Sequence, residues 1–205
     1  GTFWFSALVA VAAAVGAYEI SVMAREWGGR PSTPVSVGLA VALVVGAHFL
    51  AGSSSFLVRL APLVAVSAAI ALLWMLWRPK TGGVMPAWTG TAAVALFPAG
   101  LLFHAPLLRA LEQGGGWVFL LLAVTFATDT SAFLVGRAVG KRQLAPAISP
   151  SKTWEGAVGG VLGAVVAGIV AAEVLGLGMG AGEAALMGAI VGTVAQMGDL
   201  AESWL

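Results

Sequence analysis

Residues 116–137 read GWVFLLLAVTFATDTSAFLVGR, and residues 156–177 read GAVGGVLGAVVAGIVAAEVLGL. Each stretch is apolar over about 20 residues, the length that an α-helix needs to cross a hydrocarbon core roughly 30 Å thick. The apolar runs are continuous, whereas the strands of a membrane barrel alternate polar and apolar residues. Both stretches therefore predict membrane-spanning helices.

The rest of the chain repeats this pattern. We expect an all-α, polytopic bundle of about seven spanning helices within a single integral membrane domain, residues 1–205. The N-terminal helices occupy 1–115, and the polar motifs occupy 116–205. The expected helices have the approximate bounds 3–24, 35–51, 56–77, 84–108, 116–137, 155–177 and 181–200.

The composition supports a membrane protein and excludes several functions. Of the 205 residues, 60% are hydrophobic and 9% are charged, against about a quarter charged in a soluble domain, and the mean hydropathy is +0.98. The net charge of +1 argues against a polybasic surface, so we expect no nucleic-acid partner. The absence of cysteine excludes thiolate catalysis and cysteine metal sites. Any metal would have oxygen or nitrogen ligands.

The basic residues are distributed unevenly between the loops. The even-numbered loops between the expected helices hold only Arg59 and Arg109. Because Lys and Arg concentrate in cytoplasmic loops, we expect the N-terminus outside, and the 137–152 loop and the end at Leu205 inside. The odd-numbered loops hold the other eight: Arg25, Arg30, Arg78, Lys80, Arg137, Lys141, Arg142 and Lys152.

The longest polar segment, residues 136–156, is suited to anions. Ser149 is a candidate N-cap with Pro150 at the first helical position, which would place free backbone N–H groups beside Lys152. Phosphate fits that arrangement. The alternative is an ordinary basic loop that sets topology and contacts lipid headgroups.

Asp129 lies inside the fifth expected helix, where an uncompensated carboxylate costs roughly 2.5–3.5 kcal/mol at the bilayer centre. It shares a helical face with Thr125, Ala132 and Gly136, so we expect it to face a polar cleft and to pair with a cation or a lysine. A structural hydrogen bond or salt bridge between helices is the alternative.

The seventh expected helix carries Asp199 and Ser203 on one face with Gln196, and Glu202 lies beside that face. Oxygen ligands at a helix mouth suit Mg²⁺, which usually takes one or two carboxylates together with substrate phosphates. The alternative is a helix end solvated by acidic residues. Small residues repeat every fourth position on the sixth helix, from Gly156 to Ala172 and from Gly159 to Ala171, and predict close helix packing.

Three motifs resemble the phosphatidate cytidylyltransferase family, also called CDP-diacylglycerol synthase, over nearly the whole chain. The first is DTSAF at 129–133, followed by GR at 136–137 and GK at 140–141. The second is SPSKTWEG at 149–156, followed by GG at 159–160, and the third is GDLAES at 198–203. Their order and spacing agree with the family.

The resemblance implies Mg²⁺-dependent transfer of a cytidylyl group from CTP to phosphatidate at the cytoplasmic face of a bacterial inner membrane. It implies catalytic roles for Asp129, Lys152 and Asp199, and metal binding by Asp199, Asp129 and Glu202. Residues 116–205 would then be part of the catalytic region. The implied substrate-binding residues are Lys141, Ser149, Ser151, Lys152, Thr153, Glu155 and Ser203.

One departure from the family concerns its strongest signature, of which only Ser203, Trp204 and Leu205 are present. The missing part would bring further carboxylates and basic residues. We therefore expect the 205-residue chain to hold only part of the active site, to bind magnesium weakly and to form no CDP-diacylglycerol alone.

Other functions remain open at this point. A CTP-dependent lipid-alcohol kinase or an isoprenoid-lipid cytidylyltransferase would need the same anion and metal apparatus. A small transporter or membrane scaffold is a further alternative, although paired repeats and broken helices are not evident. The oligomeric state is open, with a homodimer among the options.

Overall fold

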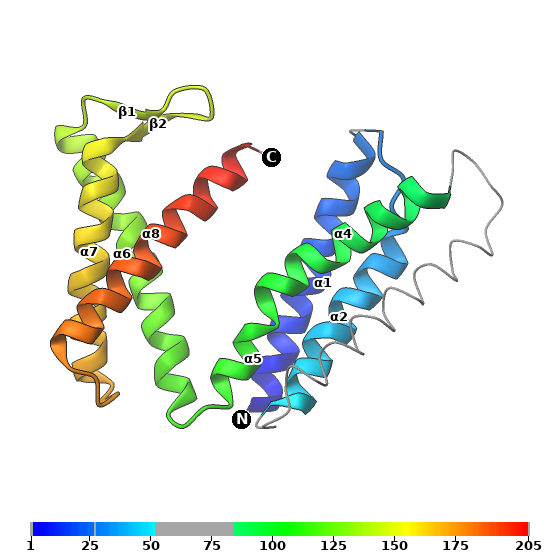
Figure 1. Cartoon of the computed structure of the whole chain (residues 1–205), viewed down its shortest axis with the longest axis horizontal. Coiled ribbons are helices and arrows are strands. Elements are labelled where there is room, and N and C mark those ends of the chain that lie inside the picture. The colour runs from blue at the N-terminus through cyan, green and yellow to red at the C-terminus, as the bar shows by residue number, and fades with distance from the viewer. Residues whose placement is uncertain (1, 27, 52–83, 205) are drawn as a thin grey trace. The chain divides into compact units, whose positions relative to one another are not determined.

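The computed structural model describes residues 2–26, 28–51 and 84–204, and it divides the chain into two compact units (Figure 1). The N-terminal unit is Gly1–Glu112, and the C-terminal unit is Gln113–Leu205. Each unit has its own core, so each is described by itself.

The N-terminal unit consists of helices packed through small apolar side chains. It holds α1 (Thr2–Glu26), α2 (Thr33–Leu50), α4 (Val84–Leu102) and α5 (His104–Arg109). Ala13, Ala17 and Ala40 are completely buried, which lets the helices approach closely. Thr91 ties α4 to the start of α2, because its hydroxyl accepts the Ser32 N–H at 2.9 Å and its carbonyl accepts the Ser36 hydroxyl at 3.1 Å.

The C-terminal unit is a three-helix packing with a small hairpin at one end. It holds α6 (Gly114–Val139), β1 (Gln143–Ala145), β2 (Ser149–Thr153), α7 (Trp154–Val174) and α8 (Ala181–Trp204). Helix α7 packs against both α6 and α8. Figure 1 shows β1 and β2 at the end of the unit where α6 ends and α7 begins, and the end of α8 reaches the same side.

Glycines make the close helix crossings possible, as the small-residue stripes predicted. A Cβ at Gly159 would come 2.6 Å from the Val135 side chain of α6, and one at Gly188 would come 2.5 Å from the Ala164 carbonyl of α7. Gly160 and Gly168 are also buried. The prediction of close helix packing is confirmed, because a larger side chain at these points would push two helices apart.

Six described segments are long and apolar enough to cross a membrane, which confirms the all-α polytopic class. The expected helix at 56–77 lies outside the described residues. The expected 84–108 helix is a single span by length, but it is divided at Phe103 into α4 and α5. The six spans are Thr2–Glu26, Thr33–Leu50, Thr89–Arg109, Gly114–Val139, Trp154–Val174 and Ala181–Ala201.

The β-hairpin was not predicted. Strands β1 and β2 are antiparallel, with Gln143 opposite Thr153 and Ala145 opposite Ser149. The residue before a proline favours an extended backbone, which suits an N-cap as well as a strand, so it is the pairing with β1 that makes this segment a strand. The hairpin carries Lys152 on an extended strand instead.

Candidate active site

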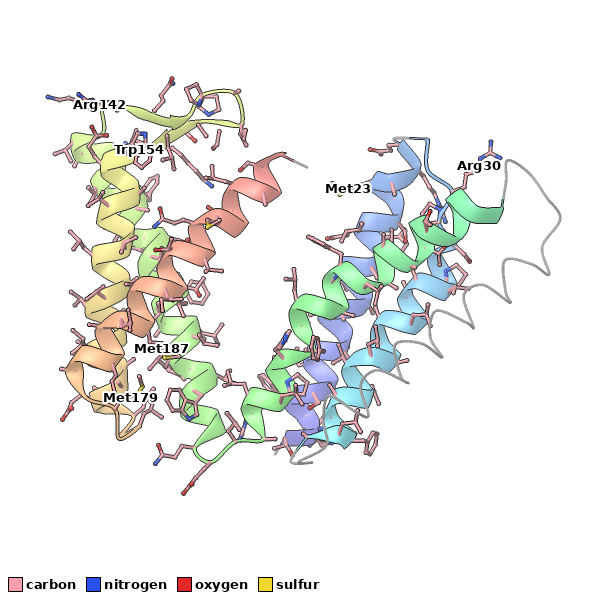
Figure 2. The ribbon with its side chains drawn as sticks, in the orientation of Figure 1. Met23, Arg30, Arg142, Trp154, Met179 and Met187 are labelled. Carbon is pink, nitrogen blue, oxygen red and sulfur yellow. The ribbon has the colours of Figure 1, made fainter. Side chains whose placement is uncertain are left out.

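A cavity of about 380 Å³ that contains charged side chains opens at the hairpin end of the C-terminal unit, by which we mean residues 136–156 together with 196–203. In Figure 2, Arg142 and Trp154 mark this end, and Met179 marks the opposite one. The volume falls within the range usual for small-molecule sites. The cavity is lined by Asp129, Ala132, Phe133, Gly136, Arg137, Leu144, Ser151, Lys152, Thr153, Gly156, Ala157, Gln196 and Asp199.

The structure brings the three predicted catalytic residues together, although they come from three different elements. Asp129 belongs to α6, Lys152 to β2 and Asp199 to α8, and all three line the cavity. The Lys152 Nζ lies 2.9 Å from the Asp199 Oδ2, and the side chains are 27% and 51% exposed, respectively. Asp129 therefore lines a cavity that also contains a lysine, but this lysine pairs with Asp199, and the pairing of Asp129 with a cation or a lysine stays a prediction.

The helix start differs from the prediction. Ser149 is not an N-cap and Pro150 is not helical, because both lie in β2. The N-cap of α7 is Thr153, whose hydroxyl oxygen accepts the Gly156 N–H at 3.1 Å. Ser149 is buried at the start of the strand, and Lys152 lies one residue before the cap. The free N–H groups of the helix are thus near Lys152, but Thr153 satisfies one of them.

Glu155 holds the loop that follows α6 in place through hydrogen bonds. Its Oε2 accepts the backbone N–H groups of Lys141 at 3.1 Å and Arg142 at 3.2 Å. The Trp154 N–H donates to the Arg142 carbonyl at 2.9 Å, and the strand pairing of Gln143 continues from there. Glu155 is absent from the lining of the cavity, and these contacts position the loop, while its contact with substrate stays a prediction.

Two other predicted binding residues do not line the cavity. Lys141 is exposed and does not line it. The Ser203 hydroxyl donates to the Asp199 carbonyl at 2.8 Å, one turn back on α8, and Ser203 does not line the cavity either. Ser151 and Thr153 do line it, as expected.

Sequence reasoning assigned no site role to Arg137 or Gln196, yet both line the cavity. Arg137 lies in the last turn of α6, and its signal in the sequence was the GR pair that follows DTSAF. The Gln196 side chain donates to the Ala157 carbonyl of α7 at 3.1 Å and so joins α8 to α7 beside the cavity.

The comparison with protein families identifies the family of the chain, because the family model for the "Cytidylyltransferase family" matches residues 1–205. The chain belongs to the cytidylyltransferase family. A phosphatidate cytidylyltransferase of Mycobacterium bovis is 30% identical over 166 residues, which cover 75% of this chain and 52% of the relative. One of Brucella abortus is 41% identical over 118 residues, which cover 57% of this chain and 43% of the relative.

The resemblance of the three motifs to this family is thereby confirmed. The chain spans about half the length, or less, of the curated relatives that it matches. No solved structure matches it significantly. A cytidylyltransferase must handle polyanions, and the ammonium and carboxylates of this cavity are groups that bind phosphate and divalent cations.

Proposed function

We propose that the protein transfers a cytidylyl group from CTP to phosphatidate and forms CDP-diacylglycerol and pyrophosphate. The observation that carries the proposal is the convergence of Lys152, Asp199 and Asp129 on one cavity, in a chain of the cytidylyltransferase family. The relatives named phosphatidate cytidylyltransferase support the choice of lipid.

The proposed reaction joins two phosphates. An oxygen of the phosphatidate phosphate attacks the α-phosphorus of CTP, and the bond from that phosphorus to the pyrophosphate oxygen breaks. Because both reactants are polyanions, catalysis depends on positioning and charge neutralisation. The Lys152 ammonium is placed to contact a phosphate, and Arg137 adds a second cation to the lining.

The two carboxylates fit the magnesium that we propose as cofactor. Asp129 and Asp199 would hold Mg²⁺, which supplies neutralisation of phosphate charge when it is bound. Among the described residues no group of three or more His, Asp or Glu side chains is placed to hold a metal. Two carboxylates suffice when substrate phosphates and water complete the coordination. The Glu202 side chain lies outside the described residues.

A transferase assay tests the function. The product of the complete gene, in membranes, is incubated with labelled CTP and Mg²⁺ and with phosphatidate, a lipid alcohol or an isoprenoid ether lipid, and the products are identified. We expect CDP-diacylglycerol from phosphatidate, and a loss of about 10²-fold or more in Lys152→Ala. A phosphorylated alcohol, a cytidylylated isoprenoid lipid only, or no product from folded protein would overturn the proposal.

We also propose that the hairpin end faces the cytoplasm in a bacterial inner membrane, where CTP is dissolved. The skewed distribution of basic residues supports this orientation. The protein has no cysteine, so Ala147→Cys in the exposed hairpin loop and Gly182→Cys at the other end of the unit give clean labelling sites. An impermeant maleimide applied outside should label position 182 alone. Labelling of position 147 from outside would show that the hairpin end faces outward and would contradict the proposed orientation.

A further inference from the structure

The Lys152 ammonium is held in an unusual way. Its Nζ is enclosed, and among the described residues it makes no hydrogen bond of good geometry, although the Asp199 Oδ2 lies 2.9 Å away. The contact is thus an ion pair held by charge, with N–H directions that the described side chains and backbone groups leave unused. Enclosed ammonium groups normally satisfy these donors, so this one is prepared for a further acceptor.

Asp199 is therefore already neutralised in the ligand-free protein. A divalent cation on the same carboxylate would lie within a few ångströms of the ammonium, and the two positive charges would repel each other in a partly enclosed site. The ammonium sits on a flexible four-carbon stem, so it can leave Asp199 without any movement of the backbone. Metal binding and displacement of Lys152 are thereby linked.

The charges that line the cavity also support a link between metal binding and displacement of Lys152. Asp129 and Asp199 are balanced by Lys152 and Arg137, so the described part of the lining has two formal charges of each sign. A divalent cation alone would leave the cavity strongly positive, and a polyphosphate alone would leave it strongly negative. Only the two together keep it close to balance.

We infer that Lys152 is an internal counter-ion, which occupies Asp199 in the ligand-free protein and moves to the nucleotide phosphate when metal and nucleotide arrive together. This inference rests on the proposed function and describes how the same site is regulated. Its consequence is that Lys152 suppresses binding of the metal alone and makes the metal and the nucleotide bind cooperatively.

Nucleotide-free metal binding tests the inference without any need for turnover. Mn²⁺, which also prefers carboxylate and water ligands, is titrated into purified protein, and free Mn²⁺ is followed by electron paramagnetic resonance. Lys152→Met should bind Mn²⁺ roughly tenfold more tightly than wild type, within the usual range of coupling between sites. Lys152→Gln should do the same and serves if the first variant does not fold. Lys152→Met combined with Asp199→Asn should lose the gain.

Arg142→Met is the matched control, because it removes one positive charge from the same end of the unit but from an exposed side chain. Its Mn²⁺ affinity should stay close to that of wild type. Equal affinity in wild type and both Lys152 variants, or an equal gain in Arg142→Met, would overturn the counter-ion role. If the wild-type protein is an active transferase but the Lys152 variants bind Mn²⁺ no more tightly than it does, this inference alone is refuted. If the Lys152 variants bind Mn²⁺ more tightly but the wild-type protein has no transferase activity, the proposed function alone is refuted.

Discussion

At both ends of the C-terminal unit, hydrogen bonds satisfy backbone groups at the ends of helices. The two ends differ in the charged side chains that take no part in these hydrogen bonds. At the turn end, residues 172–184, α7 stops at a left-handed Gly176 with φ of 61°, and the Leu177 N–H donates to the Ala172 carbonyl at 3.1 Å. The Glu183 Oε2 accepts the Gly180 N–H at 3.1 Å. At the hairpin end, Thr153 and Glu155 accept backbone N–H groups in the same manner.

The charged residues of the turn end are Glu173, whose side chain is exposed, and Glu183, which accepts the Gly180 N–H. Leu177 is buried there and packs against apolar neighbours in the core of the unit. At the hairpin end, Lys152, Asp199, Asp129 and Arg137 line a cavity, and a different residue, Thr153, caps α7. Helix capping therefore does not distinguish the two ends, whereas charged groups of both signs that line one cavity are a feature of the hairpin end.

The largest effect should come from Asp199→Asn compared with Glu183→Gln. The first removes a charge from the cavity, and the second removes a charge of the same sign from the turn end. Transferase activity should fall by roughly 10²–10³-fold in the first, because neutralisation of phosphate charge is lost, and should stay near wild type in the second. Thermal unfolding in detergent checks that both variants fold. Comparable losses in the two would remove the distinction between the ends.

Glu155→Ala and Glu183→Ala should separate positioning from capping. Amide hydrogen exchange at Lys141 and Arg142 should become faster in Glu155→Ala and stay unchanged in Glu183→Ala, because only Glu155 accepts those N–H groups. A displaced hairpin should lower kcat/KM by roughly tenfold to a hundredfold. Glu155→Gln, which keeps an acceptor oxygen, should recover part of both. Lost activity with unchanged exchange would instead indicate that Glu155 contacts substrate directly.

A glycine pair compares the steric demands of the two ends. A Cβ at Gly140 would meet the Gly136 carbonyl and come 2.6 Å from the Thr153 Oγ1, whereas one at Gly182 would have no neighbour within 4 Å. Gly140→Ala should lower the free energy of unfolding by about 1–3 kcal/mol through overpacking. Gly182→Ala, in a helix, should raise it by at most about 1 kcal/mol. Unfolding in mixed micelles, followed by tryptophan fluorescence, measures both, and a stable Gly140→Ala would mean that the loop is not tightly packed.

The smallest effect is expected for the helix cap. Thr153→Ala removes the acceptor of the Gly156 N–H and should lower the free energy of unfolding by about 1 kcal/mol, and Thr153→Ser should restore it. The same unfolding assay serves, with KM for CTP as the second readout. An increase in KM at unchanged stability would show that Thr153 binds substrate, as the sequence motif suggested.

Much of the fold and part of the site could be predicted from local patterns. The length of the apolar segments predicted the membrane-spanning helices, because a helix needs about 20 apolar residues to cross a bilayer, independent of the rest of the chain. The cost of a charge among apolar residues predicted that Asp129 faces a polar cleft, and Asp129 lines the cavity together with Lys152 and Asp199. The hairpin was missed because the Ser-Pro pair was interpreted as a helix start, whereas pairing of Gln143 with Thr153 keeps the segment extended.

By itself, the sequence determined the class of the protein, its spanning segments and the residue types of its site, since these follow from composition, length and motif. Only the tertiary structure decided which of those residues meet. The Lys152–Asp199 ion pair joins residues 47 positions apart in the chain, on β2 and α8. Glu155 binds backbone N–H groups of the loop after α6, whereas Lys152 lines the cavity, and this difference depends on where the hairpin folds back. Contacts between distant segments depend on packing, and no local pattern encodes them.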